Sequence, residues 1–502
     1  MALWLALVLP AWPLQLATRA LRLELPLAVT EGPAQRPRIA CCNPSAAAAG
    51  VQAGQALAAA QALCGELRAV PRNTAAEHAA LQVLAAWAYQ YSAQVVPLAP
   101  PARRDSGLLI ETGASTRLFG GREALHRRIA RSLRTLGHQA AFGCAATPRA
   151  AWLLACAVAQ GQAPGTAALT PQELAARVGV LPLELFDWDE RLLDTLRALG
   201  LRRAQDVLEL PRAPFVKRFG RAPLDDLDRA LGRLPDPQPA FEPAARFAAR
   251  LELPADLTEA QHLLFPAHRL LRLAAGFLRG RDRAASVFDF AAHHNPRRAR
   301  PTPPTRFALQ LAAPERDATR LARLLGERLA RLALPEPAIA LELTIDALQP
   351  YAPPRPSLLP GADGAGTDWL QLAETLHARL GSERVFQVEL ADEHRPELAW
   401  RCVPVSPAPR SAPMQAAAAA QRPLLLLTHA HPLACDAEAT PLHAGPLELL
   451  AGPERIEAGW WDSQGPAVHR DYFVARNPRG QTLWVYRELA APHGWYLHGY
   501  FA

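Results

Sequence analysis

Residues 94–121 read QVVPLAPPARRDSGLLIETGASTRLFGG. Aliphatic and β-branched residues fill 94–98 and 107–111, which is typical of two buried strands joined by a Pro/Arg loop. Over the next residues, 122–136, Leu125, Ile129 and Leu133 share one helical face while arginines occupy the other. This stretch therefore predicts a hairpin within a sheet, followed by an amphipathic helix with a basic exposed side.

The composition is that of a globular chain with several domains. A length of 502 residues predicts about three or four domains. Half of the residues are hydrophobic and a fifth are charged, which excludes a disordered chain. The net charge of +7 favours polyanionic partners only mildly, because every basic residue except Lys217 is an arginine. A GC-rich genome also produces such a bias, so the arginine content alone does not predict nucleic-acid binding.

The cysteines and the hydropathy pattern predict a cytoplasmic protein. Seven cysteines are scattered without a C-x-x-C pair or metal-ligand spacing, as expected in a reducing compartment. No later run is long and apolar enough for a transmembrane helix, so we expect no membrane partner. The apolar residues 1–20 leave one alternative open, a secretory signal and an exported protein, although the first positive charge comes only at Arg19.

Strand and helix patterns alternate twice along the chain in the order β-α-β-β-α-β, over about 1–160 and 244–348. Residues 190–220, ERLLDTLRALGLRRAQDVLELPRAPFVKRFG, lie between them and match a helix-hairpin-helix. In that motif a tight glycine turn directs backbone N–H groups towards a DNA phosphate. We therefore predict DNA contact near Arg202, Arg203, Lys217 and Arg218; the alternative is an ordinary αα-hairpin.

A second basic stretch lies in the second β-α-β-β-α-β unit. Between residues 269 and 306, nine arginines face two aspartates, an excess of seven that equals the net charge of the whole chain. A solvated face is the ordinary explanation, but a local excess next to a DNA-binding motif favours phosphate contact. The predicted DNA-binding residues here are Arg281, Arg283, Arg297, Arg298, Arg300 and Arg306.

The C-terminal third differs in composition. Residues 351–363 and 406–422 are rich in Pro, Ala or Gly and read as linkers. Residues 452–502 alternate aromatic and polar side chains in four runs separated by turns, which predicts a small antiparallel β module. Its tryptophans form either a core or a binding platform.

Several segments together resemble the Y-family (translesion) DNA polymerases over about residues 1–350. GVQAGQALAAAQALC at 50–64 is similar to the fingers pattern of that family, and AFGCAATPRAAWLLACA at 141–157 is similar to a conserved palm segment. More narrowly, the whole chain resembles the ImuB family, the polymerase-like subunits of a bacterial mutagenesis cassette. The hairpin at 94–121, ADEHRPELAW at 391–400, and the terminal GPERIEAGWWD…RDYFVAR…LWVYREL…GWYLHGYFA segments carry this resemblance.

The resemblance implies an α+β, multidomain fold shaped as a right hand: a palm with a split βαβ sheet, small fingers, a helix-hairpin-helix thumb and a β-α-β-β-α-β little finger, plus a C-terminal extension that ends in the β module. The expected boundaries are 1–30 and 70–165 for the palm, 31–69 for the fingers, 166–234 for the thumb, 244–350 for the little finger, 351–445 for a linker and partner-binding region, and 446–502 for the β module.

The same resemblance locates where metal-binding acids should stand. Y-family polymerases hold two Mg²⁺ ions with carboxylates from the first strand and the central hairpin. In this chain, the matching positions are Val8 and Pro10 in the first strand and Ser106 and Gly107 in the hairpin. The sequence thus predicts a palm without catalytic residues, cofactor or metal site. Asp105 keeps an alternative open, because a one-residue slip in the alignment restores one acid of the pair, but not both. Mg²⁺ is expected only under this alternative, an active polymerase.

The resemblance also implies partners. These are primer–template DNA, the sliding clamp, an ImuA-like protein related to RecA, and an error-prone replicative-type polymerase that performs synthesis. Clamp-binding peptides contain a Gln-x-x-Leu-x-Phe-like pattern, and the candidate here consists of Gln421, Leu424, Leu425 and Leu426. The alternative for this segment is the start of a buried strand.

Other catalytic classes lack their motifs. The sequence contains no P-loop and no G-x-S-x-G. Two pairs of histidines, His293–His294 and His429/His431, lack further partners at metal-ligand spacing. We therefore expect them to be ordinary loop histidines. A non-catalytic DNA-binding scaffold in SOS mutagenesis is the leading hypothesis, and an active translesion polymerase is its alternative.

Overall fold

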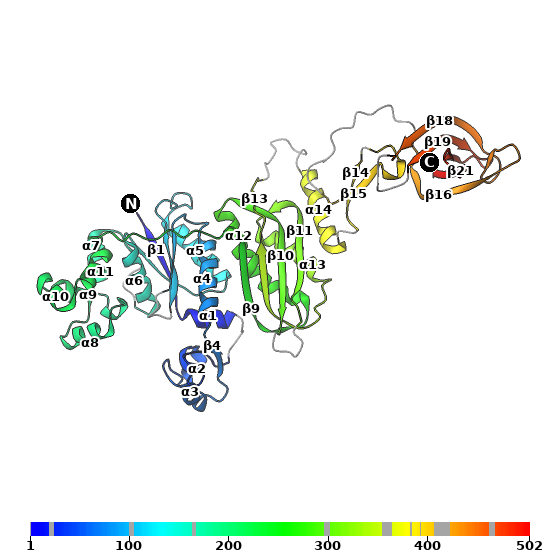
Figure 1. Cartoon of the computed structure of the whole chain (residues 1–502). Coiled ribbons are helices and arrows are strands. Elements are labelled where there is room, and N and C mark those ends of the chain that lie inside the picture. Colours follow the sequence, from blue (N-terminus) through cyan, green and yellow to red (C-terminus); the bar gives the residue numbers. More distant parts are fainter. Residues whose placement is uncertain are drawn as a thin grey trace. The chain divides into compact units, whose positions relative to one another are not determined.

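The computed structural model describes residues 2–19, 25–99, 105–162, 167–295, 302–353, 364–381, 384–391, 393–405, 422–460 and 467–501. The chain divides into two compact units, residues 1–379 and 380–502, which we describe separately. Helices and strands of both units are labelled in Figure 1.

A five-stranded sheet forms the palm, with strand order β5-β6-β1-β7-β8. The predicted hairpin is confirmed: β5 and β6 pair antiparallel, and β6 continues onto β1 at the centre of the sheet. The strands are β1 (Trp4–Leu9), β5 (Val95–Leu98), β6 (Ser106–Glu111), β7 (Ala141–Ala145) and β8 (Ala167–Ala168).

Helices cover both faces of the palm sheet (Figure 1). Alternation within β1 separates two cores: Leu5, Leu7 and Leu9 pack with α4 (Thr74–Ala88) and α5 (Arg122–Thr135), whereas Trp4, Ala6 and Val8 pack with α6 (Pro148–Ala159). Helix α5 buries Leu125, Ile129 and Leu133, as its periodicity predicts. The thumb belongs to the core on the α6 side.

The fingers and thumb are small. The fingers contain a three-stranded sheet in the order β3-β2-β4 and a small core of their own. The predicted helix at 55–67 is shorter, because Ala56 bridges to Arg38 and the helix begins only at Leu57. Helix α1 (Trp12–Arg19) precedes the fingers, whose elements are β2 (Leu27–Glu31), β3 (Arg38–Cys42), α2 (Pro44–Ala48), α3 (Leu57–Leu63) and β4 (Arg68–Pro71). The elements of the thumb are α7 (Pro171–Gly179), η1 (Leu183–Leu185), α8 (Glu190–Ala198), α9 (Ala204–Leu208), α10 (Arg212–Phe219) and α11 (Ala222–Ala230).

The little finger is a sheet in the order β11-β10-β12-β9 with two helices on one face. The β-α-β-β-α-β order predicted for this region is confirmed. Its elements are β9 (Phe247–Leu257), η2 (Ala260–Leu263), α12 (Leu264–Gly280), β10 (Arg283–His294), β11 (Thr305–Glu315), α13 (Ala318–Leu329), β12 (Ala338–Ile345) and the short β13 (Gln349–Pro350).

Palm and little finger share one continuous core. Helix α12 crosses α4 so closely that a Cβ on Gly276 would lie 2.4 Å from Cδ1 of Trp87, and one on Gly280 would lie 2.9 Å from the backbone nitrogen of Gln90. Only glycine allows this approach, since real side-chain contacts are longer. The two domains are therefore packed together through helix backbones rather than joined only by a linker.

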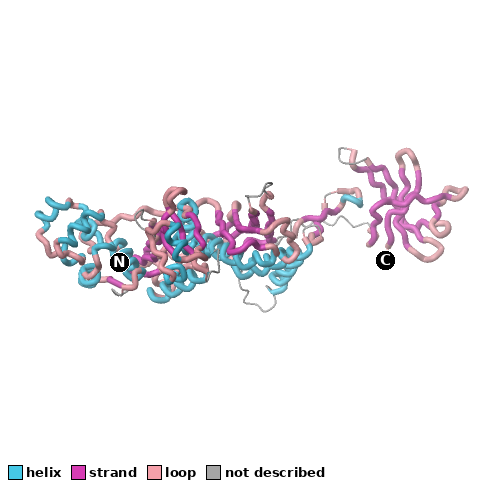
Figure 2. The backbone as a smooth tube through the Cα atoms, turned by 90° about the horizontal axis from the view of Figure 1, so that it is seen from below, coloured by secondary structure: helices cyan, strands magenta, loops and turns pink. Residues whose placement is uncertain are grey.

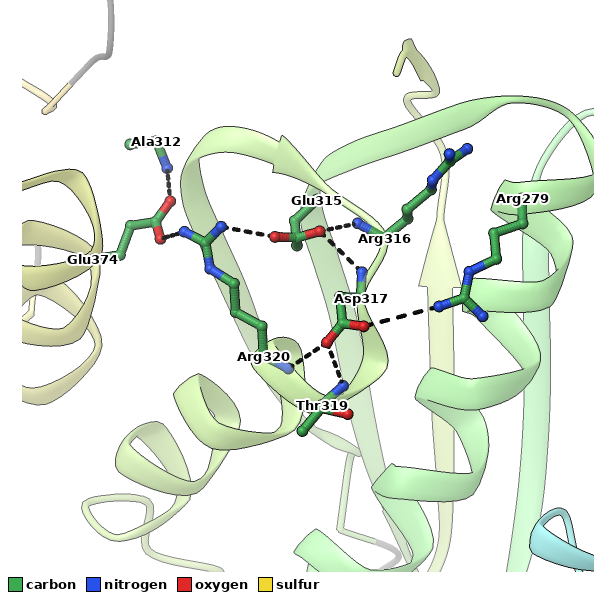
Figure 3. Close-up of polar contacts among 8 residues, drawn as sticks. All are labelled: Arg279, Ala312, Glu315, Arg316, Asp317, Thr319, Arg320 and Glu374. Carbon is green, nitrogen blue, oxygen red and sulfur yellow. Dashed lines mark hydrogen bonds and ion pairs between the residues drawn. The ribbon is translucent and has the colours of Figure 1, made fainter. Parts of the chain in front are cut away.

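A buried carboxylate helps to hold helix α14 (Gly364–Leu380) on the little finger. Glu374 forms an ion pair with Arg320 of α13 and accepts a hydrogen bond of 3.2 Å from the backbone N–H of Ala312 in β11 (Figure 3). Arg320 also pairs with Glu315 at 2.7 Å. Because Ala312 belongs to the edge strand of the sheet, Glu374 of α14 provides a hydrogen-bond acceptor for a backbone N–H at that edge.

The second unit is almost entirely β structure. Figure 2 shows its strands around the C-terminus. A six-stranded sheet has the order β17-β16-β21-β20-β19-β18, so two strands from residues expected to be linker join the four predicted ones. The elements are β14 (Gln387–Leu390), η3 (Pro396–Leu398), β15 (Trp400–Val403), β16 (Leu425–Cys435), β17 (Pro441–Leu442), β18 (Glu448–Ala458), β19 (Val468–Arg476), β20 (Thr482–Glu488) and β21 (Gly494–Tyr500).

The tryptophans of the β module have different environments. Trp484 stacks on Tyr472 with ring centroids 4.1 Å apart, and both side chains are buried. Trp460, in contrast, is 76% exposed. Among the described residues, no helix has the length and apolar character needed to cross a bilayer.

We predict that Gly276→Ala lowers the melting temperature of the first unit, although alanine favours helix by about 1 kcal/mol. Overpacking against Trp87 should cost about 1–3 kcal/mol, which outweighs that gain. Calorimetry would measure the change. Gly326→Ala in α13 is the matched control, because its nearest neighbour would be 3.6 Å away. Equal melting temperatures for the two variants would contradict a tight α4–α12 contact.

Candidate functional site

The end of β1 and the start of β6 meet where the resemblance predicts metal-binding acids. Val8 lies opposite Gly107, and Leu9 lies opposite Ser106. Pro10 follows directly after β1. The four predicted positions thus come together at one end of the sheet, where Val8 is fully buried and Ser106 is 7% exposed.

A tryptophan from α6 covers this strand end. A Cβ on Gly107 would lie 2.8 Å from Cζ3 of Trp152 and 2.1 Å from the carbonyl oxygen of Leu7. Trp152 is 1% exposed, and Gly143 of β7 allows the same close approach, because its Cβ would lie 2.3 Å from the carbonyl oxygen of Ala151. There is no room for a carboxylate side chain at position 107.

The two acids of the hairpin, Asp105 and Glu111, stabilise backbone turns. Oδ1 of Asp105 accepts a hydrogen bond of 2.9 Å from the N–H of Ala11, which has a left-handed φ of 46°. At the other end of β6, Oε1 of Glu111 accepts hydrogen bonds from the N–H groups of Leu3 (3.1 Å) and Gly113 (2.9 Å). Each carboxylate of the hairpin thus has a local structural role.

A pair of Mg²⁺ ions does not fit these residues. Mg²⁺ requires oxygen ligands, chiefly carboxylates. The strand end instead offers the side chain of Val8, the bare backbone of Gly107 and the ring of Trp152. In the part of the chain that the structure describes, no three His, Cys, Asp or Glu side chains are grouped as metal ligands. The palm position is therefore a packed core.

Sequence reasoning located these positions but missed Trp152. The segment at 141–157 was identified by its resemblance to a palm motif. Contact between this side chain and Gly107 joins residues 45 positions apart, and no local pattern encodes it.

The thumb contains the predicted glycine turn, but its backbone N–H groups are already bonded. Gly200, with φ 82°, lies between α8 and α9. Oδ2 of Asp206 accepts hydrogen bonds from the N–H groups of Arg202 (2.8 Å) and Arg203 (2.9 Å), and these bonds lower the pKa of that carboxyl group. The N–H of Ala204 donates to the carbonyl oxygen of Leu181 at 3.0 Å. An internal carboxylate thus takes the donors that the motif would offer to a phosphate.

The predicted thumb cations remain available through their side chains. Arg202 and Arg203 are exposed on the hairpin, and Lys217 and Arg218 are exposed on α10. The guanidinium of Arg218 stacks over Phe219, with 5.2 Å between Cζ and the ring centroid. DNA contact at the thumb would therefore rely on mobile charges rather than on a backbone cradle.

The predicted little-finger cations divide into different roles. Arg281 donates to the carbonyl oxygen of Pro243 and stacks over Phe277, so it fastens the interdomain linker. Arg283 is exposed at the start of β10. Arg306 lies near the other end of that strand, opposite Ala291, and borders a hollow of about 420 Å³. Arg297, Arg298 and Arg300 lie outside the described residues.

The candidate clamp-binding segment is held to the sheet and exposes leucines. Arg422 forms a bidentate ion pair with Glu454 (2.9 and 2.6 Å) and stacks over Trp484 at 4.9 Å. Leu424 is then 85% exposed and Leu425 is 57% exposed, whereas Leu426 packs against the core of the module. Gln421 lies outside the described residues.

We predict that Gly107→Asp destabilises the first unit by more than about 3 kcal/mol, because it buries a charge and overpacks Trp152. Loss of melting temperature in calorimetry would measure the effect. Gly65→Asp is the control, since a Cβ there meets nothing within 4 Å. A Gly107→Asp variant as stable as this control would show that the strand end can still open around a carboxylate.

Several known proteins are similar to this chain. Residues 14–156 match the impB/mucB/samB family. DNA polymerase IV of Aeromonas hydrophila is 31% identical over 200 residues, which is 39% of this chain and 55% of that protein. Solved structures with similar folds include DinB from Sulfolobus solfataricus (16% identity, TM-score 0.38, 68% of this chain and 98% of that chain) and an insertion ternary complex of Dbh DNA polymerase (14% identity, TM-score 0.39, 70% and 100%).

The similarity to one family extends over nearly the whole chain. Protein ImuB of Caulobacter vibrioides is 30% identical over 479 residues, covering 90% of this chain and 100% of that protein. A match over 90% of the chain extends beyond the polymerase-like part alone. This chain belongs to the ImuB family.

Proposed function

We propose that this protein is a non-catalytic DNA-binding scaffold in bacterial SOS mutagenesis and translesion synthesis. One observation carries the proposal: at the strand end where a polymerase would hold its metal ions, Val8 and Gly107 face Trp152. Phosphoryl transfer by a polymerase depends on metal ions that activate the attacking oxygen and neutralise the triphosphate. A chain with a packed core at this position has kept the hand-like fold and given up the chemistry.

The retained part of the function would be DNA contact. Arg202, Arg203, Lys217 and Arg218 project from the thumb as exposed cations, and Arg283 and Arg306 project from the little finger. Side-chain contacts to phosphate are sequence-independent and strongly dependent on salt. A scaffold that must act at any stalled primer terminus needs this kind of binding.

The second unit would recruit partners. Leu424 and Leu425 are exposed beside an anchored Arg422, as expected of a peptide that fills an apolar pocket of the sliding clamp. The other partners that we propose are an ImuA-like protein related to RecA and an error-prone replicative-type polymerase, which would supply the synthesis that this palm does not.

The alternative is an active translesion polymerase. Its support is Asp105, which lies one residue from the expected acid pair, together with the likeness to DNA polymerase IV. Against it, the carboxylate of Asp105 is bonded to the N–H of Ala11.

A primer-extension assay separates the two functions. With Mg²⁺ or Mn²⁺, we expect the purified chain to bind primer–template DNA and to add no nucleotide, because the residues that the structure describes contain no group of carboxylates that can hold the metal pair. Template-dependent extension that Asp105→Asn abolishes would instead establish the active polymerase. The Asp105→Asn protein also serves as the control for a contaminating polymerase, whose activity would persist.

For clamp binding, we predict that the double substitution L424A/L425A weakens affinity for the sliding clamp at least about tenfold, since each buried leucine contributes about 1.5–3 kcal/mol. Surface plasmon resonance with the immobilised clamp would measure it. L449A/L450A is the matched control, because Leu449 and Leu450 are also exposed leucines of the same module. Equal losses in both variants would assign the effect to stability rather than to a clamp contact.

A further inference from the structure

A group of arginines with little acidic compensation lies across the junction of palm and little finger. We call it the α5–α12 surface. It consists of Arg128, Arg131 and Arg134 on α5 and Arg269, Arg272 and Arg279 on α12. None of the six was among the DNA-binding residues expected from the sequence.

Two contacts between the helices show that the two rows of arginines adjoin. Nη1 of Arg272 donates to the carbonyl oxygen of Thr135, the last residue of α5, at 3.3 Å. The guanidinium of Arg269 lies beside Gly137 in the next loop, where a Cβ would come within 3.2 Å of its Cζ. Two helices that are more than 120 residues apart in the sequence thus form one continuous surface.

Tyr91 provides a second link between the rows. Burial raises the pKa of Tyr91, while a hydrogen bond to Ser132 and the positive charges of Arg128 and Arg279 oppose that rise. One arginine comes from each helix, so both act on the same phenol.

The charge of this surface is poorly neutralised. Glu123 is the only acid in α5, and α12 contains none. Arg279 approaches Asp317 at the start of α13 only to 3.9 Å (Figure 3). Within the described ranges, no carboxylate forms an ion pair with Arg131, Arg134 or Arg272, and all three side chains are exposed.

We propose that the α5–α12 surface binds the phosphate backbone of a second DNA segment. Guanidinium groups present forked donors that match phosphate oxygens. From Arg269 to Arg279, the α12 row extends about 15 Å, enough to contact more than one phosphate along a strand. All six side chains that define the surface are positively charged, whereas the buried core of a protein–protein interface is depleted in charge.

This DNA segment is distinct from the one at the thumb. Helix α5 covers the face of the palm sheet opposite to α6, and the thumb packs on the α6 side. A scaffold with DNA sites on both sides of its palm can hold template away from the primer terminus while its thumb engages the terminus. The site adds to the proposed function and does not depend on the thumb contact.

The test compares three triple variants of the full chain, each losing three positive charges: R131Q/R134Q/R272Q on this surface, R202Q/R203Q/K217Q on the thumb, and R323Q/R476Q/R479Q as an exposed control. Fluorescence anisotropy with a long primer–template at a series of salt concentrations gives the slope of log K against log[salt]. The α5–α12 variant should flatten this slope by about 2–3, since each lost phosphate contact removes about 0.9. R131K/R134K/R272K should restore it, because charge is kept.

A slope equal to that of the control would overturn the proposal. If the thumb variant alone flattens the slope, the proposed DNA-binding function stands and this second site falls. If the α5–α12 variant loses binding to polyglutamate while its DNA binding is unchanged, the surface belongs to an acidic protein and the nucleic-acid assignment is wrong.

Discussion

The packing of the palm and the position of the thumb depend on the close contact of α6 with the palm sheet. Gly107 and Gly143 have no side chains, so the backbone and Trp152 of this helix reach the sheet directly. A buried tryptophan of this kind removes about 150–250 Å² from water. The N-terminal end of α6 holds the thumb: Thr147 donates to the carbonyl oxygen of Ala230 at 2.8 Å, and Arg149 pairs with Asp226 at 2.7 Å. One helix therefore fills the palm and positions the thumb.

Pairing divides the arginines of this chain into two functional classes. Arg149, Arg320 and Arg470 each contact two or more acidic groups or other elements and hold parts of the fold together. Arg131 and Arg272 form no such pair among the described residues and keep their charge on the surface. An arginine paired with acids holds elements of the fold together, and its charge is largely neutralised. An arginine without such a pair adds its full charge to the electrostatic field that attracts DNA. Overall net charge cannot distinguish these classes, because both count equally in it.

Local patterns predicted the elements well and the contacts between them poorly. Alternation and periodicity located the hairpin of β5 and β6, and the missing acids at Val8 and Gly107 could be read from sequence. The sequence did not reveal that Trp152 fills the space of these missing acids, because this packing depends on a contact between strands and a helix that are distant in the sequence. The thumb illustrates the same limit: a glycine turn predicted free N–H donors, but Asp206, only a few residues away, accepts them.

The C-terminal module fixes the backbone beside Arg422 while it exposes Leu424 and Leu425. Arg422 is fixed by Glu454 and Trp484, and Gly499 lets Pro423 pack against β21, since a Cβ there would lie 2.7 Å from the proline ring. Leu424 follows immediately and is almost fully exposed. Ordering a flexible peptide on binding costs conformational entropy, and an anchored one has lost much of it beforehand. Exposure of apolar side chains from a fixed backbone is an arrangement that packing alone would not favour.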